Sequence, residues 1–263
     1  MRDLLAQPAV HKLARGATDW IDLQWSLVVA SLTRVAPQAR GKLLDVGCGD
    51  KPYEHLFRPY VDSYLGIEHQ GSFQETSASA RSKADQLYDG RRLPFDAETF
   101  DTVLCVQVLE HTPDPAALVV EMGRVLKKGG LLILMAPFSF RLHEEPHDYF
   151  RFTPHGLREL CGRADLEVFE VAPQGSLWSL LGHKLNTFLA FRVARVGEVA
   201  QRIGKLGHEA AATEGPRVWT FPLVGPAMAC VALSSRVLDR VLVDPTETLG
   251  FLVMARRRHE GPR

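Results

Sequence analysis

A short apolar run that leads directly into two glycines constrains this chain more than any other feature. Residues 42–53 read KLLDVGCGDKPY, and the apolar run suits a strand buried in a parallel sheet. Gly47 and Gly49 let the backbone turn sharply and approach a ligand closely, because neither carries a Cβ. Pro52 suits the first turn of a helix. The pattern predicts a strand, a sharp turn and a helix, and the turn either binds a nucleotide cofactor or closes an ordinary loop.

The composition indicates an ordinary globular protein of the cytoplasm. The chain of 263 residues is 46% hydrophobic, which is enough for one domain with an insertion or for two small domains. Lysine plus arginine and aspartate plus glutamate each total 31, so no net field favours nucleic acid. The four cysteines are scattered and are not expected to pair. The first residues mix charged and apolar side chains, unlike a secretory signal.

Brief apolar segments alternate with helical ones along much of the chain. Helices are expected at residues 19–35, 114–128 and 153–163, the second of them ended by Gly129 and Gly130. Strands are expected at residues 42–46, 64–68, 86–88, 101–106, 131–136, 166–171 and 249–255. This alternation predicts an α/β fold with a Rossmann-like, doubly wound, seven-stranded sheet.

The alternation lapses over residues 173–246, which we interpret as a helical insertion before the last strand. Residues 177–206 place apolar side chains at helical spacing opposite lysines and arginines, as in an amphipathic helix with a cationic face. Residues 218–235 lack charge but contain prolines and are barely long enough to span a membrane, so no span is expected. The insertion could cap the active-site mouth or lie on a membrane surface.

Three parts are therefore expected along the chain. They are a helical lead at 1–40, a cofactor-binding core at 41–173 plus 246–258, and the helical insertion at 174–245. The sequence leaves the oligomeric state open.

These motifs together resemble the class I S-adenosylmethionine-dependent methyltransferases, and in particular the broad group with GCGxxPY, LPF and LEH signatures. The resemblance runs over residues 43–171 and resumes at Leu249. It implies S-adenosylmethionine as the cofactor. Asp45 would lie near the amino-acid end of the cofactor, where a carboxylate can accept hydrogen bonds from an ammonium group. The backbone of Gly47, Cys48 and Gly49 would pass close to it. As an alternative, Asp45 would only hold the turn.

Two further acids fit the same resemblance. Glu68, about twenty residues beyond the turn, is placed to accept both ribose hydroxyls. Asp89, with Gly90 beside it in LYDGRRLPF, would accept from the adenine amino group. A solvated Asp-Gly turn is the alternative explanation of that pair.

Residues 100–111, FDTVLCVQVLEH, match the family's fourth strand and the loop after it. There Val106 and Gln107 would contact the cofactor, mainly through the backbone. Glu110 and His111 could support the loop, and His111 is also a candidate base.

The segment HEEPH at residues 143–147 satisfies the HExxH pattern of zinc proteases, but no metal is expected. Pro146 would interrupt the helical turn that has to place both histidines on one face. The resemblance implies that this loop faces the substrate. His143 or His147 could deprotonate a hydroxyl, while Tyr149 and Arg151 could hold the acceptor. The same polar side chains could instead make the loop rigid through its own hydrogen bonds.

Methyl transfer from a sulfonium is an in-line displacement with a good leaving group, so aligning the acceptor in a dry pocket is the main task. We expect a small-molecule or lipid- or glycan-linked acceptor and no nucleic acid. Two alternatives remain open. One is a non-catalytic, membrane-peripheral binding protein that keeps the cofactor fold. The other is an NAD-dependent dehydrogenase, which is disfavoured because its third glycine would fall at Pro52.

Overall fold

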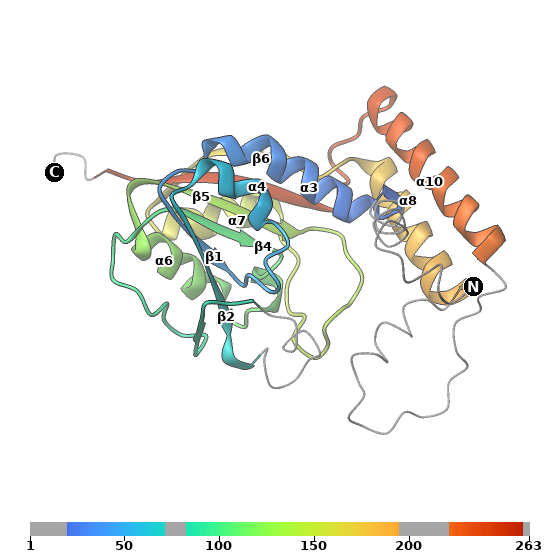
Figure 1. The fold of residues 1–263 in the computed structure, drawn as a ribbon. Coiled ribbons are helices and arrows are strands. Elements are labelled where there is room, and N and C mark those ends of the chain that lie inside the picture. Colours follow the sequence, from blue (N-terminus) through green and yellow to red (C-terminus); the bar gives the residue numbers. More distant parts are fainter. Residues whose placement is uncertain (1–19, 72–82, 195–220, 260–263) are drawn as a thin grey trace, which may run out of the picture. The chain divides into compact units, whose positions relative to one another are not determined.

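The structure, a computed structural model, describes residues 20–71, 83–194 and 221–259 (Figure 1). Contacts within the chain divide it into two compact units. The larger unit comprises residues 31–174 and 249–263, and the smaller comprises residues 1–30 and 175–248. A sheet forms the centre of the larger unit, and helices form the described part of the smaller one.

The sheet has seven strands in the order β3-β2-β1-β4-β5-β7-β6. The strands are β1 (Lys42–Val46), β2 (Ser63–His69), β3 (Gln86–Tyr88), β4 (Phe100–Val106), β5 (Leu126–Pro137), β6 (Leu166–Pro173) and β7 (Gly250–Arg257). Neighbours among β1 to β5 pair in parallel, whereas β7 is antiparallel to both β5 and β6. The predicted doubly wound, Rossmann-like sheet is therefore confirmed.

The parallel strands carry their carboxyl ends to one edge of the sheet. The chain passes from β1 outward to β2 and β3 and then returns to β4 on the other side of β1, which makes a topological switch point. The loops after β1 and β4 meet there, because a Cβ added to Gly47 would lie 2.4 Å from Cγ2 of Val108. Ligands of open α/β sheets bind at such a point.

Two helices of the larger unit begin where the sequence predicts. The helix α6 (Pro115–Val125) is capped by Asp114 and α7 (Pro154–Arg163) by Thr153, and each cap side chain accepts a backbone N–H three residues on. Proline at the first position has its φ already set for a helix. Shorter helices are α4 (Glu54–Phe57), η1 (Ala36–Gln38), η2 (Arg58–Tyr60) and η4 (Leu109–His111).

The end of α6 differs from the prediction. The helix was expected to continue to Lys128, but it ends at Val125. Leu126 takes an extended backbone and pairs with Phe100 of β4, so the two lysines that follow belong to β5. Pairing with a neighbouring strand outweighs the weak local preference of these residues for a helix. Gly129, with φ of 72°, lies within the strand rather than before it.

The smaller unit contains two long helices that lie side by side, α8 (Leu177–Phe188) and α10 (Phe221–Val241) (Figure 1). Asp239 on α10 accepts from the hydroxyls of Ser176 and Ser179. The Trp178 indole donates to the Leu242 carbonyl at 2.8 Å. Polar bonds of this kind fix the register of one helix against the other.

Part of the predicted insertion lies outside the described residues. The amphipathic helix expected over 177–206 is present as α8, continued by a π-helical turn at Leu189–Val193. Its remainder falls beyond residue 194. The helix α3 (Leu23–Val35), expected from residue 19, begins after Asp22, whose side chain accepts from Trp25 N at 3.0 Å. No helix among the described residues is long and apolar enough to cross a membrane.

Candidate cofactor and acceptor site

The turn after β1 presents open space beside its backbone. Gly47 and Gly49 have φ of 71° and 52°, in the left-handed region that favours glycine. A Cβ added to Gly49 would have nothing within 4 Å among the described residues, whereas one added to Gly47 would collide with Val108. Cys48 between them is buried, and burial raises the pKa of its thiol. The turn therefore packs on one side and can receive a ligand at Gly49.

Glu68, in β2, is bound to this turn. Its Oε2 accepts from Gly49 N at 3.0 Å and its Oε1 from His69 N at 2.9 Å. The structure thus brings the predicted ribose acceptor and the glycine turn together. Both carboxylate oxygens lie where a diol bound at the turn could donate to them.

Sequence reasoning missed an ion pair beside the glycine turn. Lys51 Nζ lies 2.5 Å from Asp85 Oδ2, and the same oxygen accepts from Gly66 N at 2.7 Å. Lys51 lies two residues after Gly49, and a charged side chain beside the glycine turn was the sequence signal that could have indicated this contact. Its partner, Asp85, belongs to the segment before β3 and carried no comparable signal.

Asp45, in β1, is 3% exposed, and its Oδ2 accepts from the Tyr64 hydroxyl at 2.6 Å. Burial raises the pKa of this carboxyl to about 7, and the Tyr64 hydrogen bond only partly opposes the shift. In the cofactor-free chain Asp45 is therefore bound within the sheet. An ammonium group within reach would favour its ionised form.

The raised pKa of Asp45 predicts that the cofactor-free protein loses stability as the pH rises. The carboxyl binds its proton more tightly in the folded state, so its contribution is complete below about pH 4 and is lost as the pH rises through about 7. We expect the difference in unfolding free energy between wild type and Asp45→Asn to change by a few kcal/mol, roughly 1.4 per pKa unit, over this interval. Urea titrations at successive pH values measure it, and parallel pH profiles of the two proteins would contradict it.

Asp89 and Gly90 lie exposed after β3. Asp89 Oδ1 accepts from the backbone N–H groups of Arg91 at 2.9 Å and Arg92 at 3.4 Å. These bonds hold the pKa of Asp89 below its ordinary value, so the carboxyl is ionised and can accept from an amino group. The turn that they form is the one foreseen from the Asp-Gly pair.

The loop after β4 contains a buried donor in need of a partner. Val106 ends the strand, and Gln107 follows with φ of 55° and donates its backbone N–H to Met135 at 2.9 Å. Gln107 Nε2 is buried and has no hydrogen-bond partner among the described residues. An unpaired buried amide is costly, and a bound ligand would satisfy it.

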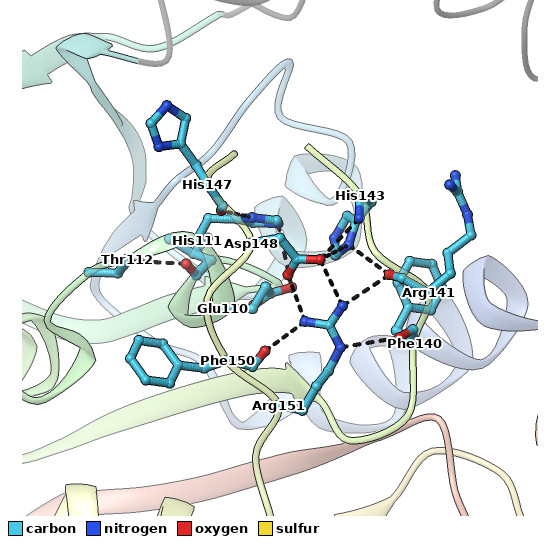
Figure 2. A network of polar contacts seen from close by, with 11 residues as sticks. Glu110, His111, Thr112, Phe140, Arg141, His143, His147, Asp148, Phe150 and Arg151 are labelled. Atoms are coloured by element: carbon cyan, nitrogen blue, oxygen red, sulfur yellow. Dashed lines mark hydrogen bonds and ion pairs between the residues drawn. The ribbon is translucent and has the colours of Figure 1, made fainter. Parts of the chain in front are cut away.

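A buried carboxylate lies close to two imidazoles at the same edge. Glu110 is fully buried, and neither of its carboxylate oxygens has a hydrogen-bond partner among the described residues. Its Oε1 lies 3.9 Å from His111 Nε2, and the His111 and His143 rings pack edge to face with centroids 4.6 Å apart. Burial raises the pKa of Glu110 to about 8. We call Glu110, His111 and His143 the acceptor-side cluster (Figure 2).

Hydrogen bonds assign the tautomers of both histidines. His111 Nδ1 lies 2.7 Å from the His147 carbonyl, and His143 Nδ1 lies 3.2 Å from both the Arg141 carbonyl and Asp148 Oδ2. Each of these partners accepts, so each Nδ1 must donate, and a lone pair remains on each Nε2. Burial lowers the pKa of His143, which favours its neutral form. Both imidazoles can therefore accept a proton or bind a metal through Nε2.

Arg151 organises the loop that carries His143. Its guanidinium donates to both Asp148 oxygens, at 2.6 and 2.8 Å, and holds the pKa of that carboxyl well below its usual range. The remaining bonds go to the carbonyls of Phe140, Arg141 and Phe150 (Figure 2). The Asp148 side chain is only 1% exposed. Arg151, predicted to hold the acceptor, binds the loop itself in this structure, as in the second of the two roles considered for this segment.

The HEEPH segment is a turn with a cis Glu145–Pro146 peptide bond, not a helix. Its two histidines therefore do not share a helical face, as the presence of Pro146 predicts. His147 is exposed, its Nδ1 lies 2.9 Å from the Tyr149 hydroxyl, and its ring points away from the acceptor-side cluster (Figure 2). His143 meets His111 instead, and sequence reasoning missed this pairing.

Fold and site together define a Rossmann-like α/β protein with a nucleotide-cofactor site at the carboxyl edge of its sheet. Residues 44–134 match the family described as methyltransferase domain. A ubiquinone biosynthesis O-methyltransferase of Psychrobacter arcticus is 33% identical over 182 residues, which is 58% of this chain and 70% of that protein. The chain belongs to the methyltransferase family, and its cofactor is S-adenosylmethionine.

Other relatives match over shorter stretches. The ubiquinone biosynthesis O-methyltransferase of Neisseria meningitidis is 31% identical to this chain over the matched residues. The match covers 49% of this chain and 65% of that protein, so this chain spans just under two thirds of that protein's length. A phosphatidylethanolamine N-methyltransferase of Cereibacter sphaeroides is 32% identical over 38% of this chain and 52% of its own length. Neither the dehydrogenase nor the non-catalytic alternative is favoured by these relatives.

Solved structures agree on the fold. The complex between the Haloferax volcanii Trm112 methyltransferase activator and a methyltransferase contains a chain with a TM-score of 0.54, 17% identity and coverage of 96% of this chain and 97% of that one. The cyclase SpnF has a TM-score of 0.50 and 20% identity, with coverage of 87% of this chain and 80% of its own. At such identities the likeness concerns the fold alone, and function must be argued from the site.

The residues of the site fit S-adenosylmethionine. The open side of Gly49 gives room for the cofactor, Glu68 offers two oxygens beside it, and Gln107 offers a buried donor without a partner. The cofactor supplies an electrophilic methyl group on a sulfonium.

Proposed function

We propose that the protein transfers a methyl group from S-adenosylmethionine to a hydroxyl group of a small-molecule or lipid- or glycan-linked acceptor. The observation that carries the proposal is the acceptor-side cluster. Glu110 and His111 lie in the loop after β4, and His143 lies in the loop after the neighbouring strand β5. Three groups able to accept a proton thus gather at the edge of the sheet where the cofactor turn also lies.

A hydroxyl acceptor needs such a group, whereas an acceptor with a free lone pair on nitrogen does not. The acceptor oxygen attacks the methyl carbon, the carbon–sulfur bond breaks, and the sulfonium leaves as a neutral thioether. The hydroxyl proton passes to Nε2 of His111 or His143, both of which carry a lone pair in the assigned tautomers. Two relatives named as O-methyltransferases support an oxygen acceptor.

We assign the cofactor contacts to the residues around the glycine turn. Glu68 binds the ribose hydroxyls, Gln107 contacts the cofactor from the loop after β4, and Asp89 accepts from the adenine. The remaining contacts are Asp45, Gly47, Cys48, Gly49, Gly90 and Val106. On the acceptor side, Tyr149 is 43% exposed and is available to contact the acceptor, with His147 bonded to its hydroxyl. Arg151 acts by holding the loop.

Cell extracts incubated with methyl-labelled S-adenosylmethionine and the purified protein test the class of acceptor. The expected result is label in the small-molecule or lipid fraction and none above background in nucleic acid. A heat-denatured sample and the Glu68→Ala variant serve as controls. Equal labelling of nucleic acid and of lipid would contradict the proposal.

Contact with a membrane surface is the second part of the proposal, and the smaller unit supports it. Leu181, Leu185 and Phe188 recur at helical spacing on α8 and are 48%, 46% and 55% exposed. Leu233, Val237 and Val241 form a similar exposed row on α10. Lys184 and Arg192 are exposed along the same stretch as the first row, and cations of this kind favour anionic lipid.

Liposome flotation tests this contact. Wild type is expected to float with phosphatidylglycerol vesicles, and the double variant Leu185→Glu, Phe188→Glu should lose most of the floating fraction, because each change sets a charge against the lipid. Val120→Glu, which alters a residue of α6 that is 44% exposed, is the matched control and should float as wild type does. Flotation of the double variant at the wild-type level would rule out this surface.

A further inference from the structure

The acceptor-side cluster places three lone-pair donors close together. A Glu110 oxygen and one ring nitrogen each of His111 and His143 lie within 4.8 Å of one another. Both histidines give their Nδ1 proton to an acceptor elsewhere, and both Glu110 oxygens are buried with no hydrogen-bond partner among the described residues. Acceptors that face one another without a donor repel, and burial of an unpaired carboxylate is costly. A proton on Glu110 or a bound cation would relieve this cost.

The surroundings of the two imidazoles are those of metal-binding histidines. Such histidines donate their second ring N–H to a carbonyl or a carboxylate, which fixes the tautomer and the orientation of the ring. His111 donates to the His147 carbonyl at 2.7 Å, and His143 faces Asp148, which Arg151 holds with two bonds (Figure 2). The lone pair of His111 Nε2 therefore lies on the side of the ring next to Glu110, 3.9 Å from its Oε1.

We propose that Glu110, His111 and His143 form a binding site for a divalent transition-metal ion. Two imidazoles and one carboxylate are a ligand set of zinc sites that keep a coordination position open. Zinc bond lengths of about 2.0 to 2.2 Å in a tetrahedral site set neighbouring ligand atoms about 3.4 Å apart. The present 3.9 Å between His111 Nε2 and Glu110 Oε1 is close to that value. The HExxH pattern contributes only its first histidine, and the buried glutamate comes from the LEH segment.

The catalytic consequence rests on the proposed function. Glu110, His111 and His143 would hold the ion, which would lower the pKa of a hydroxyl bound at its open position; the hydroxyl proton would then pass to solvent, and the two histidines would act as ligands rather than as bases. Metal binding itself does not depend on that function, so the two are tested separately.

Titration of tag-free, metal-stripped full-length protein with Co²⁺ and Zn²⁺ tests the site. We expect one equivalent of Co²⁺ to produce visible d–d absorption bands and Zn²⁺ to abolish them in competition. Glu110→Gln, which keeps the volume but removes the charge, and His143→Gln should each weaken Zn²⁺ binding at least tenfold by calorimetry. His155→Gln, at an exposed position on α7 that is not part of the cluster, is the matched control and should bind as wild type does.

A circular dichroism spectrum and an S-adenosylmethionine titration of each variant separate loss of the site from loss of folding. Cofactor binding that is retained while Zn²⁺ binding falls supports the proposal. Lack of Co²⁺ bands in folded wild type, or equal Zn²⁺ affinity in Glu110→Gln and wild type, would overturn it, and the cluster would then hold a proton instead. Metal binding without methyl transfer to any extract would leave the site standing and contradict the proposed function alone.

Discussion

Glu68→Ala is expected to lower the affinity for S-adenosylmethionine about a hundredfold. The proposed contact is a carboxylate that accepts from two ribose hydroxyls, and hydrogen bonds to a charged group contribute about 1.5 to 3 kcal/mol each. Loss of two such bonds at the lower end of this range, about 3 kcal/mol, corresponds to a change of about a hundredfold. The variant also removes the acceptor for Gly49 N, so the turn itself becomes less ordered. Calorimetric titration with the cofactor measures the effect.

Two further variants make this result specific. Glu68→Gln keeps one acceptor oxygen and should lie between wild type and Glu68→Ala. Glu167→Ala, an exposed position on β6, removes the same charge and should leave the affinity unchanged. Wild-type affinity in Glu68→Ala would show that the cofactor binds elsewhere.

Gly47→Ala is expected to be the most destabilising single change in the glycine turn. The added methyl group would lie 2.4 Å from Cγ2 of Val108, a stiff β-branched side chain that cannot rotate away cheaply. The left-handed backbone costs about 1 to 2 kcal/mol for a residue with a Cβ, and overpacking adds about 1 to 3 kcal/mol. Together these lower the melting temperature by roughly 5 to 15 °C at about 2 to 4 °C per kcal/mol.

Gly49→Ala is the matched comparison, because it has the same sign of φ but no neighbour within 4 Å of the added Cβ in the part of the chain that the structure describes. Its melting temperature should fall by only a few degrees, from backbone strain of about 1 to 2 kcal/mol. It should still weaken cofactor binding, since the methyl group occupies the open side of the turn. Differential scanning calorimetry and cofactor titration separate the two effects. Equal melting temperatures for the two variants would show that Val108 accommodates the methyl group.

The cofactor side was predictable because its signals are local. The apolar run, Gly47 and Gly49 can be interpreted within a few residues, and the alternation of strands and helices indicates the doubly wound class of the sheet. The two helix starts at Asp114 and Thr153 are equally local. The end of α6 has no such local signal, because the helix stops where Leu126 pairs with Phe100 of another strand. The Lys51–Asp85 ion pair likewise joins segments that only the fold brings together.

The acceptor-side cluster illustrates the same limit. The histidines at positions 111 and 143 were each singled out, yet nothing in the order of residues says that their rings meet. They do so because β4 and β5 are parallel neighbours, which brings the loops after their carboxyl ends to one edge of the sheet. The unpaired state of Glu110 depends on burial by the loop that Arg151 holds, which is a tertiary property. Arg151 was a candidate either to hold the acceptor or to make the loop rigid, and its donors bind the loop.

Identification of the atom that receives the methyl group tests the central claim most directly. The protein is incubated with methyl-labelled S-adenosylmethionine and the extract fraction that accepts label, and the labelled product is purified. The account predicts that the methyl group is bound to oxygen and that one equivalent of S-adenosylhomocysteine is released for each methyl group transferred. A methyl group on nitrogen or carbon, or cofactor binding with no transfer to any fraction, would contradict it.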